Sequence, residues 1–230
     1  MERRGFIKFC AASAAAIGAP AVGADARVQL YSRARLVDDK SQPLRAAAIP
    51  VNRNLIFHYP FAATPCFLLN LGKAVKPTQL KTVAGAAYEW KGGIGASRSV
   101  VAYSAICAHR LSYPTKDISF ISFRSEKSAR NRIANVIHCC SEHSQYDPAE
   151  GARVVAGPAP QPLAAILLEH DAATDELHAV GTLGGELFNE FFAKYEFRLA
   201  MEHGGAVRQA AGDACVVQAL ENYCKQQVKC

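Results

Sequence analysis

The sequence predicts an all-β domain that is followed by a helical C-terminal extension. Apolar runs of strand length alternate with turn residues from about residue 27 to residue 183, and 16 Gly and 11 Pro residues allow many turns. After residue 184 the pattern changes, because apolar side chains then recur at nearly helical spacing. These observations place a β-rich domain first and a helical segment after it.

The expected strands are short, and most are bounded by Pro, Asn or Gly. They cover residues 35–37, 55–59, 66–71, 99–106 and 133–137. Segments 163–168 and 177–180 are expected to pair as a hairpin around the polar turn 171–176. The expected helix covers residues 186–203 and ends at Gly204-Gly205.

The overall composition is that of a folded protein with a mild positive charge. Half of the 230 residues are hydrophobic, which is enough for a core and excludes wholesale disorder. The 26 Lys and Arg residues against 20 Asp and Glu residues give a net charge of +6. This excess is small for a nucleic-acid-binding protein and compatible with an acidic protein partner. No run approaches the roughly 18–20 consecutive apolar residues of a membrane span.

The N-terminus resembles the twin-arginine (Tat) export signal. Arg3-Arg4 is followed by Phe6, Ile7 and Lys8, and then by an Ala-rich stretch that ends near residue 24. This resemblance implies a leader over residues 1–24, export of an already folded protein, and a periplasmic location. An uncleaved leader that acts as a weak membrane anchor stays open as an alternative.

Two short motifs follow two of the expected strands and contain the residues that could bind a metal. The strand 99–106 is followed directly by Cys107-Ala108-His109. The strand 133–137 is followed shortly afterwards by Cys140-Ser141-Glu142-His143. Together they offer two thiols and two imidazoles to a shared centre. Such a set suits a tetrahedral zinc ion or a [2Fe-2S] cluster that has two cysteines on one iron and two histidines on the other.

The residues after the second motif resemble those of the Rieske iron–sulfur protein family. Ser144-Gln145-Tyr146-Asp147-Pro148 follows His143 directly, and a Gly-Pro-rich loop covers residues 157–163. The resemblance spans about residues 99–168. It implies a Rieske-type antiparallel β-sandwich with a small cluster-binding subdomain over residues 25–183, and a helical extension over 184–230.

The resemblance also implies a role for each residue of the two motifs. Cys107 and Cys140 would bind one iron of a [2Fe-2S] cluster, and His109 and His143 would bind the other. The Ser144 hydroxyl would donate to a bridging sulfide, the Tyr146 hydroxyl would donate to a cysteine sulfur, and Pro158 would lie in the loop that covers the cluster. Because these hydrogen bonds stabilise the reduced state, we expect a potential in the upper part of the family range of about −150 to +300 mV.

The chain departs from the family pattern in three places. The two positions that often carry an inter-loop disulfide are Ser112 and Glu142 here, so that disulfide is expected to be absent. The glycine that usually separates the second histidine from the serine is also missing. An alternative register makes Cys139 the ligand and leaves Cys140 outside the cluster. The segment between the motifs is long, and its basic residues suggest either a solvated insertion or a docking patch.

Four further cysteines stand outside the motifs. They are Cys66, Cys215, Cys224 and Cys230, and they could form one or two disulfides in an oxidising compartment. The local pairings 215–224 and 224–230 both stay open.

The resulting functional prediction is a one-electron carrier with a [2Fe-2S] cluster that passes electrons towards a c-type cytochrome. It would act alone or as a subunit of a periplasmic oxidoreductase, such as the small subunit of a molybdoenzyme. The Rieske subunit of a quinol–cytochrome c reductase is the alternative within the same class, and a zinc-stabilised structural or binding module is the alternative from another class. The chain offers no separate catalytic centre.

Overall fold

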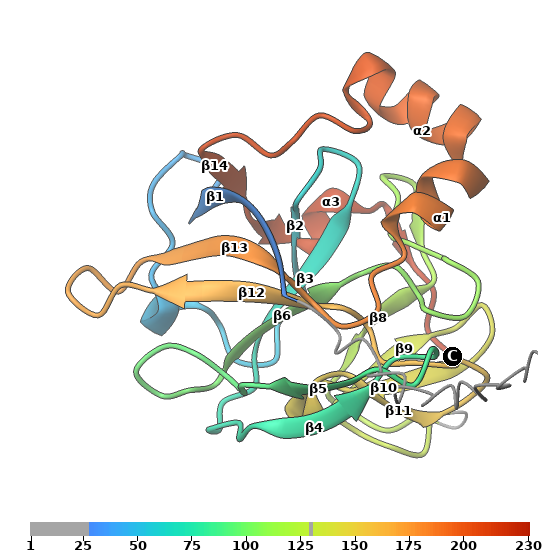
Figure 1. Cartoon of the computed structure of the whole chain (residues 1–230), viewed down its shortest axis with the longest axis horizontal. Coiled ribbons are helices and arrows are strands. Elements are labelled where there is room, and N and C mark those ends of the chain that lie inside the picture. Colours follow the sequence, from blue (N-terminus) through green and yellow to red (C-terminus); the bar gives the residue numbers. More distant parts are fainter. Residues whose placement is uncertain (1–27, 129–130) are drawn as a thin grey trace, which may run out of the picture.

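A computed structural model describes residues 28–128 and 131–230 of the chain (Figure 1). The predicted leader, residues 1–24, lies outside the described residues. No helix among the described residues is long and apolar enough to cross a membrane. The described helices are short: α1 (Phe188–Lys194), α2 (Glu196–His203), α3 (Leu220–Tyr223), and the 3-10 turns η1 (Ala46–Ala48), η2 (Pro148–Glu150) and η3 (Gly204–Ala206).

A curled eight-stranded sheet forms the larger part of the fold. Its strands follow one another in the order β14 (Ala214–Val216), β1 (Gln29–Val37), β13 (Leu177–Leu183), β12 (Ala165–His170), β6 (Val100–Ser104), β3 (Pro65–Asn70), β2 (Leu55–His58) and β15 (Gln218–Ala219). All neighbours pair antiparallel except β1 and β14. The Cys215 thiol of β14 donates to the carbonyl of His58 in β2 over 3.2 Å, so the sheet curls until its two ends approach each other.

A smaller four-stranded sheet packs below the first one (Figure 1). Its order is β11 (Arg153–Ala156), β10 (Ser144–Asp147), β9 (Val136–Cys139) and β8 (Ile121–Arg124). Two ribbons accompany it: β4 (Thr78–Lys81) with β5 (Ala87–Trp90), and β7 (Ile118–Ser119) with β16 (Gln226–Gln227). Both predicted metal-binding motifs lie at this end of the molecule.

The core has two main layers because successive residues of a strand point to opposite faces. In β3, Phe67 and Leu69 pack towards the smaller sheet, whereas Cys66 and Leu68 point into the curl of the larger sheet. Central strands buried on both faces explain why the sequence shows continuous apolar runs there. The all-β prediction is confirmed in this coarse form.

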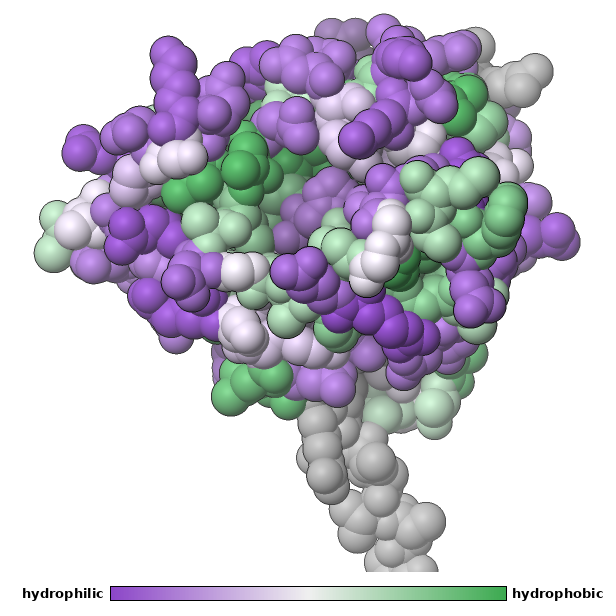
Figure 2. Space-filling model, turned by 90° about the horizontal axis from the view of Figure 1, so that it is seen from above, coloured by the Kyte–Doolittle hydropathy of each residue, from purple (hydrophilic) through white to green (hydrophobic). Residues whose placement is uncertain are grey.

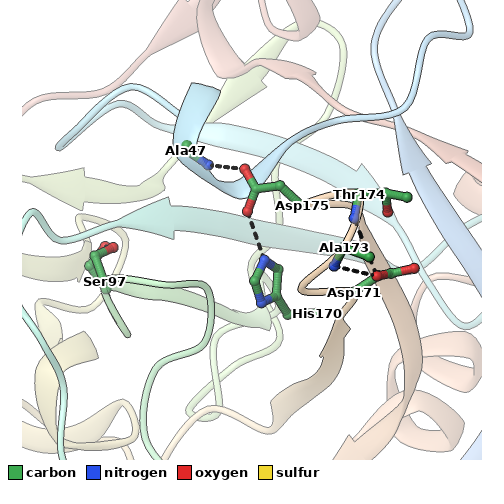
Figure 3. A network of polar contacts seen from close by, with 8 residues as sticks. Ala47, Ser97, His170, Asp171, Ala173, Thr174 and Asp175 are labelled. Carbon is green, nitrogen blue, oxygen red and sulfur yellow. Dashed lines mark hydrogen bonds and ion pairs between the residues drawn. The ribbon is translucent and has the colours of Figure 1, made fainter.

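The expected hairpin around residues 171–176 is confirmed. β12 and β13 pair from Ala165 with Leu183 to His170 with Leu177. The Asp171 carboxylate caps the turn by accepting from the N–H groups of Ala173 and Thr174, and Asp175 accepts from the Ala47 N–H and contacts the His170 ring at 2.7 Å (Figure 3). These contacts hold the turn against the 3-10 turn η1.

The C-terminal segment differs from a purely helical extension. The expected helix is present as α1 and α2, which are separated at Tyr195. Its Phe side chains pack inward against the strand-to-loop region after β6, and the rings of Phe191 and Tyr113 meet edge to face at 4.9 Å. The chain after His203 then adds β14 and β15 to opposite edges of the larger sheet and β16 to β7. The segment therefore completes the β-domain.

The surface seen from above is mostly hydrophilic, with apolar residues in separate patches (Figure 2). The two most exposed large apolar side chains of the helices are Phe197 and Met201 of α2, which are 77% and 68% exposed. The charged residues of the segment between the motifs are divided: Lys127 and Arg132 are exposed, whereas Arg124 of β8 is half-buried and donates to the Val228 carbonyl.

The tail is attached to β2 through His58, which leads to a prediction on acid stability. Burial, with His203 and Lys116 nearby, lowers the pKa of His58 to about 4. As the pH falls, the His58 imidazole therefore binds a proton in the unfolded chain before it does so in the folded protein. The free energy of unfolding is lost as the pH falls from about 6.5 towards 4. We expect His58 to lower the free energy of unfolding by about 2 kcal/mol between pH 7.5 and pH 5. Urea unfolding should show a smaller acid loss in His58→Gln; an equal loss in both proteins would contradict the assignment.

Candidate metal centre

Two loops at the same end of the molecule bring two cysteine thiols together. The first loop follows β6 and begins at Cys107, and the second loop connects β9 to β10 and begins at Cys139, the last residue of β9. The two thiols lie beside each other and are both buried in the core between the sheets. The pair that the structure forms is therefore Cys107 with Cys139.

The two loops share one backbone design. In the first loop the N–H groups of His109 and Arg110 point to the Cys107 sulfur, and in the second loop those of Ser141 and Glu142 point to the Cys139 sulfur. In each loop the donors are thus the second and third residues after the cysteine. The fourth residue is left-handed in both, with φ 61° at Leu111 and φ 58° at His143.

Cys140 is placed differently from its predicted role as the second thiolate ligand. It forms a disulfide with Cys230, the last residue of the chain. The physical reason is strand alternation: Cys139 points into the core, so the next side chain is directed away from Cys107. The structure thus agrees with the alternative register in placing Cys139, and not Cys140, beside Cys107. The local pairings expected for the tail cysteines are not formed, because Cys215 and Cys224 are free thiols.

The Tyr146 hydroxyl lies next to the thiol pair, at the Cys107 sulfur. Its hydroxyl oxygen lies 3.2 Å from the Cys107 sulfur and accepts from the Ala108 N–H at 3.1 Å. Accepting from this N–H leaves the hydroxyl proton available, so the hydroxyl can donate to the sulfur. β10 holds the ring in place by pairing Tyr146 with Ile137.

Two buried polar atoms near the thiol pair have no hydrogen-bond partner among the described residues. One is the Ser144 hydroxyl oxygen, which stands directly opposite Cys139 in the pairing of β10 with β9. The other is Nδ1 of His109, two residues after Cys107. Buried polar atoms are normally paired. Their lack of partners fits a group that these atoms would contact.

The electrostatics of the thiol pair favour an anionic Cys107. The hydrogen bond from Cys139, together with those from Tyr146 and the loop N–H groups, lowers the pKa of the Cys107 thiol. The same contact raises the pKa of Cys139, and burial raises that of the Tyr146 phenol. The loops thus provide donors that stabilise negative charge on sulfur.

His143 occupies the exposed end of the second loop. Its ring centroid lies 5.8 Å from that of His138, whose side chain points to the face of β9 opposite Cys139. The neighbouring Glu142 carboxylate lies 3.7 Å from Nε of Arg110 and so links the ends of the two loops. The role of His143 as an iron ligand stays a prediction. Sequence reasoning missed the contact between Arg110 and Glu142, which has no motif of its own.

The Gly-Pro-rich loop packs against the second metal-binding loop. A Cβ atom on Gly157 would lie 2.4 Å from the His143 carbonyl oxygen and 2.6 Å from the Ser144 Cα atom, and the residue has φ 85°. Pro158, predicted to cover the cluster, is exposed beside it. The first loop is supported from the other side by α1, where the Lys194 ammonium donates to the Arg110 carbonyl at 2.6 Å.

The donor set fits a thiophilic metal centre. The loop after β6 supplies the buried Cys107 thiol and the unpartnered His109 nitrogen, and β9 and β10 supply the buried Cys139 thiol and the unpartnered Ser144 hydroxyl. Thiolate and imidazole are the ligands of both zinc sites and histidine-ligated iron–sulfur clusters.

Comparison with known proteins adds one similar structure. No protein-family model matches the chain. The soluble domain of the Rieske protein II (soxF) from Sulfolobus acidocaldarius is similar at 25% sequence identity, with a TM-score of 0.47, over 68% of this chain and 82% of that one. At this TM-score the likeness assigns neither fold nor function, so the functional inference rests on the residues of this chain.

The contact of Gly157 leads to a prediction on stability. Gly157→Ala places a Cβ atom against backbone and forces a left-handed conformation, so we expect a loss of at least about 1–2 kcal/mol of unfolding free energy. Gly212→Ala, at a position with open space, is the matched control. Urea denaturation measures both; equal midpoints for the two variants would show that Gly157 is not held against the loop.

Proposed function

We propose that this protein is a one-electron carrier with a Rieske-type [2Fe-2S] cluster. The observation that carries the proposal is the buried pair of Cys107 and Cys139 thiols beneath the Tyr146 hydroxyl. Buried polar atoms of His109 and Ser144, from the same loop and from β10, have no partner among the described residues and support it. Cys107 and Cys139 would bind one iron, and His109 with the predicted ligand His143 would bind the other. The residue resemblance noted in the sequence supports the same assignment.

The bound cluster would supply a site that accepts and releases one electron, and the chain's own residues would set how readily it does so. Neutral imidazoles in place of two thiolates reduce the negative charge at the site and raise its potential. Tyr146 and the four loop N–H groups donate to the two sulfurs, so they stabilise the more negative, reduced state. The buried core lies on the inner side of the loops, so water would reach the bound cluster from the outer, histidine side.

The electron path and the location belong to the same proposal. The protein would be exported by the Tat pathway and pass electrons in the periplasm towards a c-type cytochrome. It would act as a free carrier or as a subunit of an oxidoreductase, either a molybdoenzyme or a quinol–cytochrome c reductase. The outer end of the two loops, where His109 and His143 lie, would face the redox partner.

The deciding experiment is the EPR spectrum of purified, dithionite-reduced protein, with iron and sulfide assayed on the same sample. Two irons per chain and a rhombic signal with an average g near 1.9, as the family resemblance implies, would support the proposal. An EPR-silent protein with one zinc would overturn it and favour the zinc-stabilised module.

Two adjacent cysteines allow a sharp test of the ligand set. Cys139→Ser removes a sulfur ligand, so we expect iron and sulfide content to fall by at least about tenfold. Cys140→Ser breaks only the disulfide, and we expect it to keep two irons. Cys230→Ser breaks the same disulfide from the tail and should behave like Cys140→Ser. Loss of the cluster in Cys140→Ser alone would return the ligand role to Cys140.

The hydroxyl of Tyr146 is expected to tune the potential. Tyr146→Phe removes its donation to the Cys107 sulfur, so the reduced state loses stabilisation and the midpoint potential should fall by tens of millivolts. Redox titration followed by EPR measures this shift. Tyr103→Phe is the control, because that buried hydroxyl donates to the Pro148 carbonyl instead. Equal potentials in wild type and Tyr146→Phe would show that the hydroxyl does not reach the sulfur.

A further inference from the structure

The opposite face of β9 carries a second group of thiophilic side chains. His138, Cys140 and Cys230 have ligand atoms that all lie within 4.8 Å of one another. Cys230 Sγ lies 3.5 Å from Nδ1 and 3.6 Å from Nε2 of His138. In the structure the two cysteines are joined as a disulfide. These residues are separated from the Cys107–Cys139 pair because alternate residues of β9 face opposite sides.

The surroundings of His138 are polar and incompletely paired. His138 is fully buried, and the one hydrogen-bond partner of its ring among the described residues is the Cys230 sulfur. Its cross-strand neighbours are Ser122 of β8 and Gln145 of β10. The Ser122 hydroxyl and the Gln145 side-chain oxygen are both buried without a partner. A buried histidine between two unpaired polar atoms is costly unless it has a further role.

The tail is positioned by contacts other than the disulfide. β16 pairs with β7, and the Val228 N–H donates to the Ser119 carbonyl at 2.9 Å. The Ser128 hydroxyl donates to the Cys230 carbonyl at 2.6 Å, and the Arg124 guanidinium donates to the Val228 carbonyl. Cys230 therefore stays next to Cys140 and His138 when the disulfide is opened.

We propose that reduction of the Cys140–Cys230 disulfide creates a binding site for one thiophilic divalent ion such as zinc. Its ligands would be Cys140, Cys230 and His138. A dithiol reductant would donate two electrons and two protons to the disulfide and become a disulfide itself. Each of the two new thiols would then release its proton on binding the ion, and a water molecule would complete the tetrahedron. Two thiolates balance the charge of the ion.

The distances in the structure suit such a site. In a tetrahedron with Zn–S of about 2.3 Å and Zn–N of about 2.0–2.1 Å, the sulfur–nitrogen edge is about 3.5–3.6 Å. This is the separation that Cys230 and His138 already have. The group of His138, Cys140 and Cys230 would thus hold a disulfide in its oxidised state and a metal ion in its reduced state. On the proposed export route the chain folds in the cytoplasm, where thiols stay reduced.

The test measures zinc uptake by the full-length protein. The purified chain is treated anaerobically with dithiothreitol, desalted, incubated with zinc chloride, desalted again and assayed for zinc. We expect one more zinc per chain in the reduced wild type than in the untreated wild type, and no such gain in Cys230→Ser. Cys224→Ser, which removes a buried tail thiol outside the group, is the matched control and should gain the zinc.

Alkylation mapping by mass spectrometry identifies the thiols involved. Zinc should protect Cys140 and Cys230 from iodoacetamide, whereas the extent of alkylation at the buried Cys224 should be the same with and without zinc. His138→Gln keeps both thiols, so it should still form the disulfide but bind zinc at least about tenfold more weakly. Equal zinc uptake by wild type and Cys230→Ser, or protection of Cys107 and Cys139 alone, would overturn the proposal. Neither result depends on the presence of the iron–sulfur cluster.

Discussion

The contact between the buried thiols of Cys107 and Cys139 is the interaction on which the rest of the site depends. It joins a loop from the larger sheet to a loop from the smaller sheet, and it does so at the edge of the shared core. Negative charge on a buried sulfur has to be stabilised by hydrogen-bond donors, and the loop N–H groups and Tyr146 supply such donors. The left-handed residues Leu111 and His143 follow from the same requirement, because each turn has to fold its N–H groups back onto a sulfur.

Adjacent side chains at the end of β9 point to opposite sides, so Cys139 and Cys140 make different contacts. Cys139 points into the core and meets Cys107, whereas Cys140 is available to the C-terminal tail. The second loop is therefore held on one face by the thiol pair and on the other by the disulfide. In the proposed electron carrier, such restraint would keep the geometry of the metal site constant between its charge states. It also leaves His138 enclosed between the disulfide and two polar neighbours.

The C-terminal segment stabilises the site from a distance. β14 and β15 extend opposite edges of the larger sheet, α1 binds the carbonyl of Arg110 in the first loop, and β16 leads the chain end to the second loop. These contacts are spread over several elements that are far apart in the sequence. Truncation of the tail would therefore expose sheet edges and release both loops together.

The sequence by itself determined the β-rich class, the hairpin of β12 and β13, and the two motifs around Cys107 and Cys139-Cys140. Local patterns suffice there, because strand propensity, turn residues and ligand spacing are short-range properties. Only the tertiary structure decided which of the adjacent cysteines faces Cys107 and which partner Cys140 takes. The register of β9 in the sheet fixes the first choice. The disulfide partner of Cys140 lies 90 residues away in the C-terminal tail. Long-range strand pairing places this tail, and no local sequence pattern indicates such pairing.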